Sequence, residues 1–136
     1  MDWITDEIAI GNYLEALDVS LLEREKLRSA LSLDGTLYSK RPKDFSLDRI
    51  ETVRLEDAPG NELRLFQLAV ETLGELVKDS PPVLVQCHAG RSRSAVVVAG
   101  HLMLAHGLNA DQALEQVAAK RQIAITPGVE RLLDSL

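Results

Sequence analysis

The chain has 136 residues, of which 15 are Lys or Arg and 21 are Asp or Glu, so its formal net charge is −6 at pH 7. This charge argues against a general nucleic-acid-binding protein, because such a protein needs a basic surface that displaces counterions from the phosphates. With 46% hydrophobic residues, the length suits one domain, residues 1–136, with its own core, and a monomer is favoured.

Three features of the sequence bear on the compartment. The single cysteine excludes an internal disulfide, and the first three residues show neither a basic leader nor an apolar signal core. The most apolar stretch, residues 95–105, is interrupted by Gly100 and His101 and is too short to span a bilayer. We therefore expect a cytoplasmic protein with no membrane span.

The first half of the chain combines one short helix with two strands. Ser20 and Glu23 have the spacing of a capping box, in which the two side chains satisfy free N–H groups at a helix start. The longest irregular stretch follows the first strand and is typical of a surface loop. The expected elements are a helix from Ser20 to Leu27, strands at 30–33 and 50–55, and a loop at 34–48 that carries Lys40, Arg41, Pro42 and Lys43.

The second half begins with a long amphipathic helix. Apolar residues recur at helical spacing from Leu63 to Val77, and Asn61 is a capable N-cap. Two prolines at 81 and 82 end this helix, and the apolar run 83–85 is expected to form a buried central strand. Three further helices are expected: Ser92 to Ala105 ending near Gly107, Ala110 to Lys120 after Asn109 with Gln112 in a capping box, and Pro127 to Leu136 with Thr126 as N-cap.

Strands that alternate with helices predict an α/β fold with a mostly parallel central sheet and helices on both faces. If the strands around Leu33, Val53 and Val85 run parallel, the loops that leave their carboxyl ends gather along one edge, where ligands bind in such sheets. The 40–43 segment, Asp57 and the loop after the central strand would then meet at that edge.

The loop after the central strand is the most informative segment of the chain. It reads Cys87-His88-Ala89-Gly90-Arg91-Ser92-Arg93-Ser94. The backbone N–H groups of residues 88–93 can surround an anion if Gly90 supplies a tight turn and a helix begins near Ser92. The anion would then lie over the sulfur of Cys87. The helix end and Arg93 would favour the thiolate, and Arg93 would bind two phosphate oxygens at once.

Phosphomonoester hydrolysis through a thiolate also requires an acid that protonates the leaving oxygen. Asp57 is the candidate, although an aspartate in such a turn often only caps the next helix. Glu56 is the adjacent competitor. Ser94 is a candidate donor to the thiolate and, alternatively, an ordinary first-turn serine. Arg91, with the 40–43 segment, would hold a second anionic group, unless its side chain is simply solvated.

The histidines do not indicate a metal site. His101 and His106 are five residues apart on one expected helix, so they do not share a face as a metal-binding pair would. The sequence has no other cluster of Cys, His and carboxylate residues. We therefore expect no metal and no cofactor.

These residues resemble the compact dual-specificity branch of the protein tyrosine phosphatases, which share a Cys-x5-Arg-Ser/Thr phosphate loop. The likeness covers nearly the whole chain, including segments 8–12, 30–33, 118–121 and 125–127. It implies that Cys87 is the nucleophile, Arg93 the phosphate clamp, Asp57 the general acid and then base, and Ser94 the hydroxyl that assists the thiolate. Two positions depart from the pattern: Gln86 replaces the usual histidine before the nucleophile, and Gln122 replaces a frequent proline.

The expected function is a cysteine-dependent phosphatase that acts through a phosphocysteine on phosphotyrosine in proteins and, as a second class, on phosphoserine or phosphothreonine. Its partners would be phosphorylated proteins or peptides. Two alternatives stay open: a phosphatase for phosphoinositides or other polyphosphates, and a phosphate-binding module without turnover. A rhodanese-like sulfurtransferase also uses a cysteine loop, but it would not explain Arg93-Ser94 together with Asp57.

Overall fold

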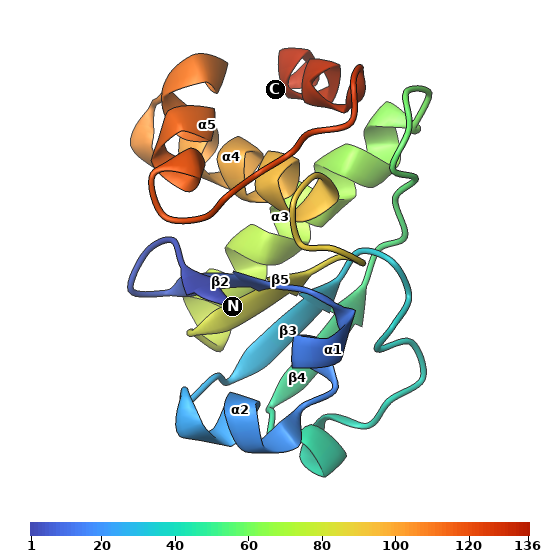
Figure 1. Ribbon diagram of the computed structural model, residues 1–136, viewed down its shortest axis with the longest axis vertical. Helices are drawn as coiled ribbons and strands as arrows, with labels where there is room; N and C mark the ends of the chain where they lie inside the picture. The colour runs from blue at the N-terminus through green and yellow to red at the C-terminus, as the bar shows by residue number, and fades with distance from the viewer.

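A five-stranded sheet forms the centre of the computed structural model, which describes all 136 residues (Figure 1). The strand order is β1-β2-β5-β3-β4. Strands β2, β5, β3 and β4 run parallel, and only β1 is antiparallel to its neighbour, which confirms the predicted mostly parallel sheet. The strands are β1 (Asp2–Trp3), β2 (Ile8–Gly11), β3 (Ser29–Ser32), β4 (Arg49–Thr52) and β5 (Val83–Gln86).

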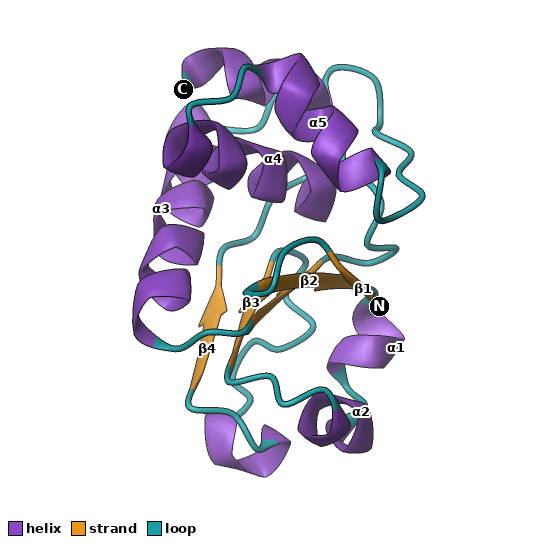
Figure 2. Ribbon diagram, turned by 90° about the vertical axis from the view of Figure 1, so that its left-hand side faces the viewer, coloured by secondary structure: helices purple, strands orange, loops and turns teal.

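Helices cover both faces of this sheet, as predicted (Figure 2). Alternate residues of β5 point to opposite faces. Val83 and Val85 belong to a core of 26 buried residues on the side of the long helices, whereas Leu84 belongs to a core of nine residues on the other side. One layer contains α1 (Tyr13–Ala16), α2 (Val19–Arg24) and the 3₁₀ helix η1 (Pro42–Phe45); the other contains α3 (Leu63–Asp79), α4 (Arg93–His106), α5 (Ala110–Ala118) and the 3₁₀ helix η2 (Val129–Ser135).

The ends of two helices agree with the local sequence. Asn109 and Gln112 form the predicted capping box of α5, with both side-chain-to-backbone hydrogen bonds present. Gly107 ends α4 in the left-handed conformation, with φ of 65°. Such a backbone favours glycine because a side chain would be strained there.

Three predicted helix starts are wrong. Asp18, not Ser20, caps α2, because its carboxylate accepts a hydrogen bond from the Leu21 N–H and starts the helix earlier. Asn61 does not cap α3, which begins at Leu63 after Glu62, because the Asn61 side chain bonds to the preceding loop instead.

The predicted C-terminal helix also begins later than expected. Gly128, in a left-handed conformation with φ of 95°, separates Pro127 from the 3₁₀ helix η2. The N–H of Thr126 donates to the Ser92 hydroxyl at 3.0 Å, so this residue joins the loop after β5 rather than capping a helix.

The predicted strand at 50–55 is shorter in the structure, because β4 ends at Thr52. Val53 and Leu55 still donate backbone hydrogen bonds to Ser32 and Leu33, so the segment stays attached to β3 while it leaves the sheet. This path carries Asp57 to the carboxyl edge of the parallel strands.

None of the helices combines the length and the apolar composition that crossing a membrane requires.

Candidate active site

A pocket of about 370 Å³ lies at the carboxyl end of β5. It is lined by Asp57, Cys87, His88, Ala89, Arg91, Ser92, Arg93 and Ala124. The parallel strands therefore bring the candidate acid and the candidate nucleophile to one hollow, as the sequence predicts. Glu56, the alternative acid, does not line it.

The loop from Cys87 to Arg93 forms one wall of this pocket. Cys87 is 2% exposed, directly after β5. Gly90 has φ of 68°, and a Cβ there would lie 2.6 Å from the Gly11 carbonyl oxygen, so only glycine fits this turn. The Ser92 side chain makes no capping hydrogen bond to α4, and the N-terminal end of α4 follows directly. A helix N-terminus of this kind favours a bound anion.

Arg93 has one anchored and one unused group. Its Nη1 donates to the Leu55 carbonyl oxygen at 3.1 Å, which ties the guanidinium to the segment that leads to Asp57. Its Nε is buried and has no hydrogen-bond partner. A buried donor without a partner costs about 1–3 kcal/mol. The guanidinium is therefore arranged to donate to an acceptor that enters the pocket.

Asp57 lies in a loop whose ends are joined by one side chain. The Asn61 amide accepts from the Glu56 N–H at 2.6 Å and donates to the carbonyl oxygens of Glu56 and Ala58 at 2.6 and 3.0 Å. Asn61 thus closes residues 56–61 into a compact turn, and Asp57 lies within it with an exposed side chain that faces the pocket.

Ser94 occupies the first turn of α4. Its side chain is fully buried, and its hydroxyl has no hydrogen-bond partner in the protein. A capping bond to its own helix is the ordinary role of such a serine. Its absence leaves this hydroxyl able to donate elsewhere, and assistance to the Cys87 thiolate remains a prediction.

Sequence comparison identifies the family to which the chain belongs. A family model described as "Dual specificity phosphatase, catalytic domain" matches residues 13–133, which include every residue that lines the pocket. The chain belongs to this family.

Individual relatives agree with this assignment. Dual specificity protein phosphatase 1 of Arabidopsis thaliana is 30% identical over 121 residues, which are 89% of this chain and 60% of the relative. The crystal structure of DUSP15 superimposes with a TM-score of 0.78 at 26% identity, covering 98% of this chain and 84% of that one. Human DUSP28 shares the fold, with a TM-score of 0.84 at 21% identity, covering 99% of this chain and 94% of that one.

This dual specificity phosphatase domain has a hydrogen-bonded amide where the family usually has a histidine. Gln86 is fully buried, and its Oε1 accepts from the Ser32 hydroxyl at 2.7 Å. Its Nε2 donates to the Asp34 carboxylate at 2.8 Å and to the Thr36 hydroxyl at 3.2 Å. The amide therefore joins the ends of β5 and β3 at the residue directly before Cys87.

The carboxylate in this network is held in its charged form. Burial raises the pKa of Asp34. Hydrogen bonds from the Thr36 N–H and from the side chains of Gln86 and Thr36, together with the charge of Arg93, lower this pKa by more than burial raises it. The net pKa lies below the ordinary value of 3.8. Our sequence reasoning missed Asp34, although its place just after a strand at the ligand-binding edge was a usable signal.

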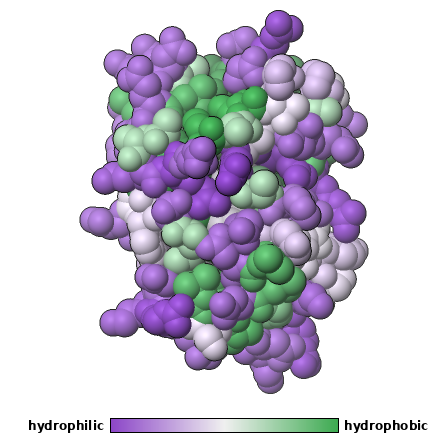
Figure 3. Space-filling model, in the orientation of Figure 1, coloured by the Kyte–Doolittle hydropathy of each residue, from purple (hydrophilic) through white to green (hydrophobic).

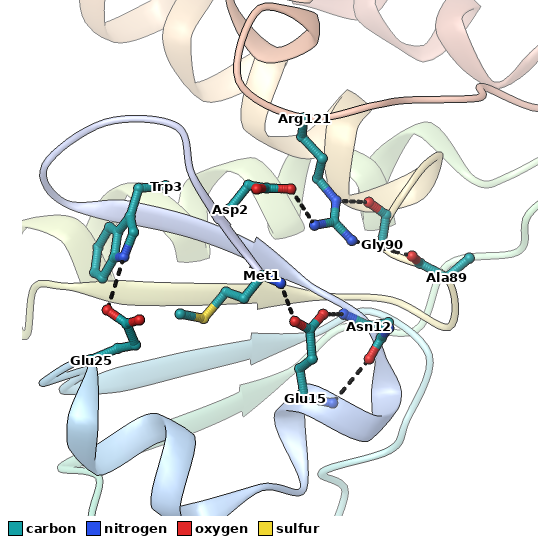
Figure 4. Close-up of polar contacts among 9 residues, drawn as sticks. All are labelled: Met1, Asp2, Trp3, Asn12, Glu15, Glu25, Ala89, Gly90 and Arg121. Atoms are coloured by element: carbon teal, nitrogen blue, oxygen red, sulfur yellow. Dashed lines mark hydrogen bonds and ion pairs between the residues drawn. The ribbon is translucent and has the colours of Figure 1, made fainter.

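Arg121 supports the loop at residues 87–93 from outside (Figure 4). Its Nε donates to the Gly90 carbonyl oxygen at 2.6 Å, and its Nη2 to that of Ala89 at 3.4 Å. Its Nη1 pairs with the Asp2 carboxylate at 2.8 Å. Local pattern could not reveal this role, because Gly90 and Asp2 lie 31 and 119 residues away in sequence.

Helix α1 covers the opposite side of the loop. The Tyr13 ring stacks on His88 with a centroid distance of 4.5 Å and an angle of 5°, and the Tyr13 N–H donates to the His88 carbonyl oxygen. Asn12 and Glu15 fix the start of α1 by a capping box, and Glu15 also pairs with the amino group of Met1 (Figure 4).

Of the four basic residues expected to hold a second anionic group, only one lies at the pocket. Arg91 lines the pocket with an exposed side chain. Lys40, Arg41 and Lys43 do not line it, and Arg41 pairs with Asp44 instead.

The histidines of α4 lie apart from the pocket. No group of three or more His, Cys, Asp or Glu side chains is arranged to hold a metal ion. His101 is half-buried, and its pKa is lowered by burial and by His106, against a smaller opposing effect of Glu7.

Proposed function

We propose that this chain is a cysteine-dependent phosphatase that removes phosphate from phosphotyrosine in proteins and, as a second class, from phosphoserine or phosphothreonine. The pocket that Cys87, Arg93 and Asp57 line together supports this proposal most directly, because it combines nucleophile, clamp and acid. Membership of the dual specificity phosphatase family supports it independently.

In the first step, the Cys87 thiolate attacks phosphorus from the floor of the pocket. A sulfur–phosphorus bond forms as the bond to the ester oxygen breaks, and Asp57 gives its proton to that oxygen. The backbone N–H groups of the loop and the guanidinium of Arg93 stabilise the charge on the remaining phosphate oxygens. The products are the dephosphorylated alcohol or phenol and a phosphocysteine.

In the second step, water attacks the phosphocysteine. The Asp57 carboxylate takes a proton from this water as the sulfur–phosphorus bond breaks. A hydrogen bond from the Ser94 hydroxyl stabilises Cys87 as it leaves with the electron pair. Inorganic phosphate then departs, and Asp57 is again protonated for the next cycle.

One observation favours a second substrate class. Arg91 lines the pocket beside the clamp, so a phosphoinositide or another polyphosphate would find a second cation there. Comparison of phosphotyrosyl peptides, phosphothreonyl peptides and phosphoinositides by kcat/KM distinguishes the two substrate classes.

The proposal is tested by Cys87→Ser, which removes the nucleophile and keeps the shape of the loop. We expect no turnover of an aryl phosphate or a phosphopeptide, with phosphopeptide binding retained. Ser39→Ala, on an exposed loop residue, is the matched control and should act as wild type. Normal turnover by Cys87→Ser would exclude the cysteine mechanism, and an inactive wild type that still binds phosphopeptides would indicate a binding module.

A further inference from the structure

A second hollow of about 350 Å³ lies next to the candidate active site, and we call it the α5 hollow. Its lining combines apolar side chains of α5 and the following segment with two carboxylates. The residues are Asp111, Leu114, Glu115, Ala118, Ile123 and Ile125.

One short segment separates the α5 hollow from the active-site pocket. Ala124 lines the pocket, whereas its neighbours Ile123 and Ile125 line the α5 hollow. The Ala124 N–H donates to the Arg91 carbonyl oxygen at 3.1 Å, which fixes this segment against the phosphate loop. Successive side chains therefore face the two hollows in turn, and a ligand that crosses Ala124 contacts both.

The segment that leaves α5 crosses in front of α4 (Figure 1). Its residues Ile123, Ala124 and Ile125 line the two hollows. The space-filling view from the same side shows apolar surface between α5 and the C-terminal segment, surrounded by hydrophilic side chains (Figure 3). An extended peptide bound in the pocket would pass along this face.

The charges on the rim indicate what the α5 hollow binds. Asp111 and Glu115 are four residues apart on α5, so their carboxylates lie on the same side of the helix. Both are exposed, and neither forms an ion pair within the protein. An apolar floor with carboxylates at its rim fits a side chain with an aliphatic stem and a cationic head, which is the form of Lys and Arg.

We propose that the α5 hollow binds a Lys or Arg side chain of the phosphorylated peptide substrate, close in sequence to the phosphorylated residue. This inference rests on the proposed phosphatase function and adds a sequence preference to it. The stem packs on Leu114, Ile123 and Ile125, and the head pairs with Asp111 and Glu115.

The test uses phosphotyrosyl peptides of equal length in which one Lys is placed at each position in turn on either side of the phosphotyrosine. Matched peptides carry Gln or Glu instead. We expect Lys at one or two positions to raise kcat/KM about 3- to 10-fold over Gln, the effect of an exposed ion pair with apolar packing. The gain should decrease at high salt, because exposed ion pairs are screened.

The decisive variant is Asp111→Asn with Glu115→Gln. It should lose the Lys preference and keep wild-type turnover of a small aryl phosphate. The control is Glu71→Gln with Glu75→Gln, an exposed pair with the same spacing and charge change on α3, which should keep the preference.

Each alternative outcome overturns a specific statement. Equal rates for Lys and Gln peptides at every position, a preference for Glu, or a Lys preference that survives in the α5 variant would each overturn the docking site. An equal loss in both double variants would indicate net charge rather than docking. Failure to hydrolyse even the aryl phosphate would overturn the proposed function itself.

Discussion

Cys87 and Asp57 enter the proposed first step in opposite protonation states, one as a thiolate and the other as a carboxylic acid. The structure gives them different surroundings. Cys87 is buried under the loop at the helix N-terminus, whereas Asp57 is exposed on a turn that Asn61 closes. The proposed nucleophile therefore lies buried at the end of strand β5, and the proposed acid lies at the exposed rim of the pocket.

Asp57→Asn tests the role of the acid. We expect kcat/KM to fall about 10²- to 10⁴-fold on phosphotyrosine or phosphothreonine peptides, because their leaving oxygens need a proton. For an aryl phosphate with a good leaving group, kcat/KM should stay close to wild type, because it covers the steps up to departure of the leaving group and not the later hydrolysis of the phosphocysteine. Glu56→Gln is the control and should leave both rates unchanged. Equal losses on both substrates, or a leaving-group effect in Glu56→Gln instead, would exclude Asp57.

Arg93→Lys tests the clamp. Lysine keeps the charge but lacks the planar pair of donors, so we expect kcat/KM on an aryl phosphate to fall about 10²- to 10³-fold. Arg91→Lys, the same exchange at an exposed position of the loop, should keep most of the activity on this singly charged substrate. A variant Arg93→Lys with near-normal kcat/KM would show that charge alone suffices.

At the scale of elements, the sequence predicted features whose causes are local. The capping box of α5 depends on two residues three apart, Asn109 and Gln112, and it was predicted correctly. The start at Thr126 is wrong because its N–H bonds to Ser92, which lies far away in the sequence. The start at Asn61 is wrong because its side chain bonds back to Glu56 and Ala58 in the preceding turn instead of to the helix. The meeting of Cys87, Arg93 and Asp57 at one pocket was also predictable, because a loop motif and the edge of a parallel sheet determine where they lie, whereas their catalytic roles stay predictions.

The stability of the fold should depend on pH through Asp34, which joins the ends of β3 and β5. The pKa of Asp34 is lower in the folded protein than its ordinary value of 3.8. The carboxylate therefore stabilises the fold above about pH 3.8, and this contribution is lost as the pH falls through the folded value. Asp34→Asn should lower the free energy of unfolding at pH 7 by about 1 kcal/mol.

Urea unfolding of wild type and Asp34→Asn at pH 7 and at successively lower pH measures this difference. The gap between them should narrow as the pH falls. Asp134→Asn, an exposed carboxylate without a hydrogen-bond partner, should follow wild type throughout. A constant gap would contradict the assignment to the Asp34 charge.

At the scale of the whole molecule, the candidate active site depends on parts of the chain that are far apart. The proposed nucleophile, Cys87, follows the central strand β5, and the proposed acid, Asp57, follows the edge strand β4. The loop after β5 is held by Arg121 beyond α5 and, through it, by Asp2 of β1. The negative net charge of the chain is compatible with the proposed anion binding, because Arg93 and the N-terminal end of α4 lie together at one pocket.

Arg121→Gln tests this long-range support. We expect kcat/KM to fall about 10- to 100-fold, because the loop loses its outer hydrogen bonds and its N–H groups shift relative to the sulfur. Lys120→Gln, the same charge change on the exposed neighbour, should behave as wild type. Arg121→Lys should recover part of the loss. Normal kinetics in Arg121→Gln would show that the loop holds its shape without this contact.

Cys87 is the single cysteine of the chain, and it is free and buried below the pocket. A thiolate that attacks phosphorus is also the form that peroxide oxidises, first to a sulfenic acid. Many redox-sensitive proteins protect this state by forming a disulfide with a second, nearby thiol. This chain offers no such thiol, so recovery of an oxidised Cys87 by a disulfide route depends on reductants from outside the chain, such as glutathione.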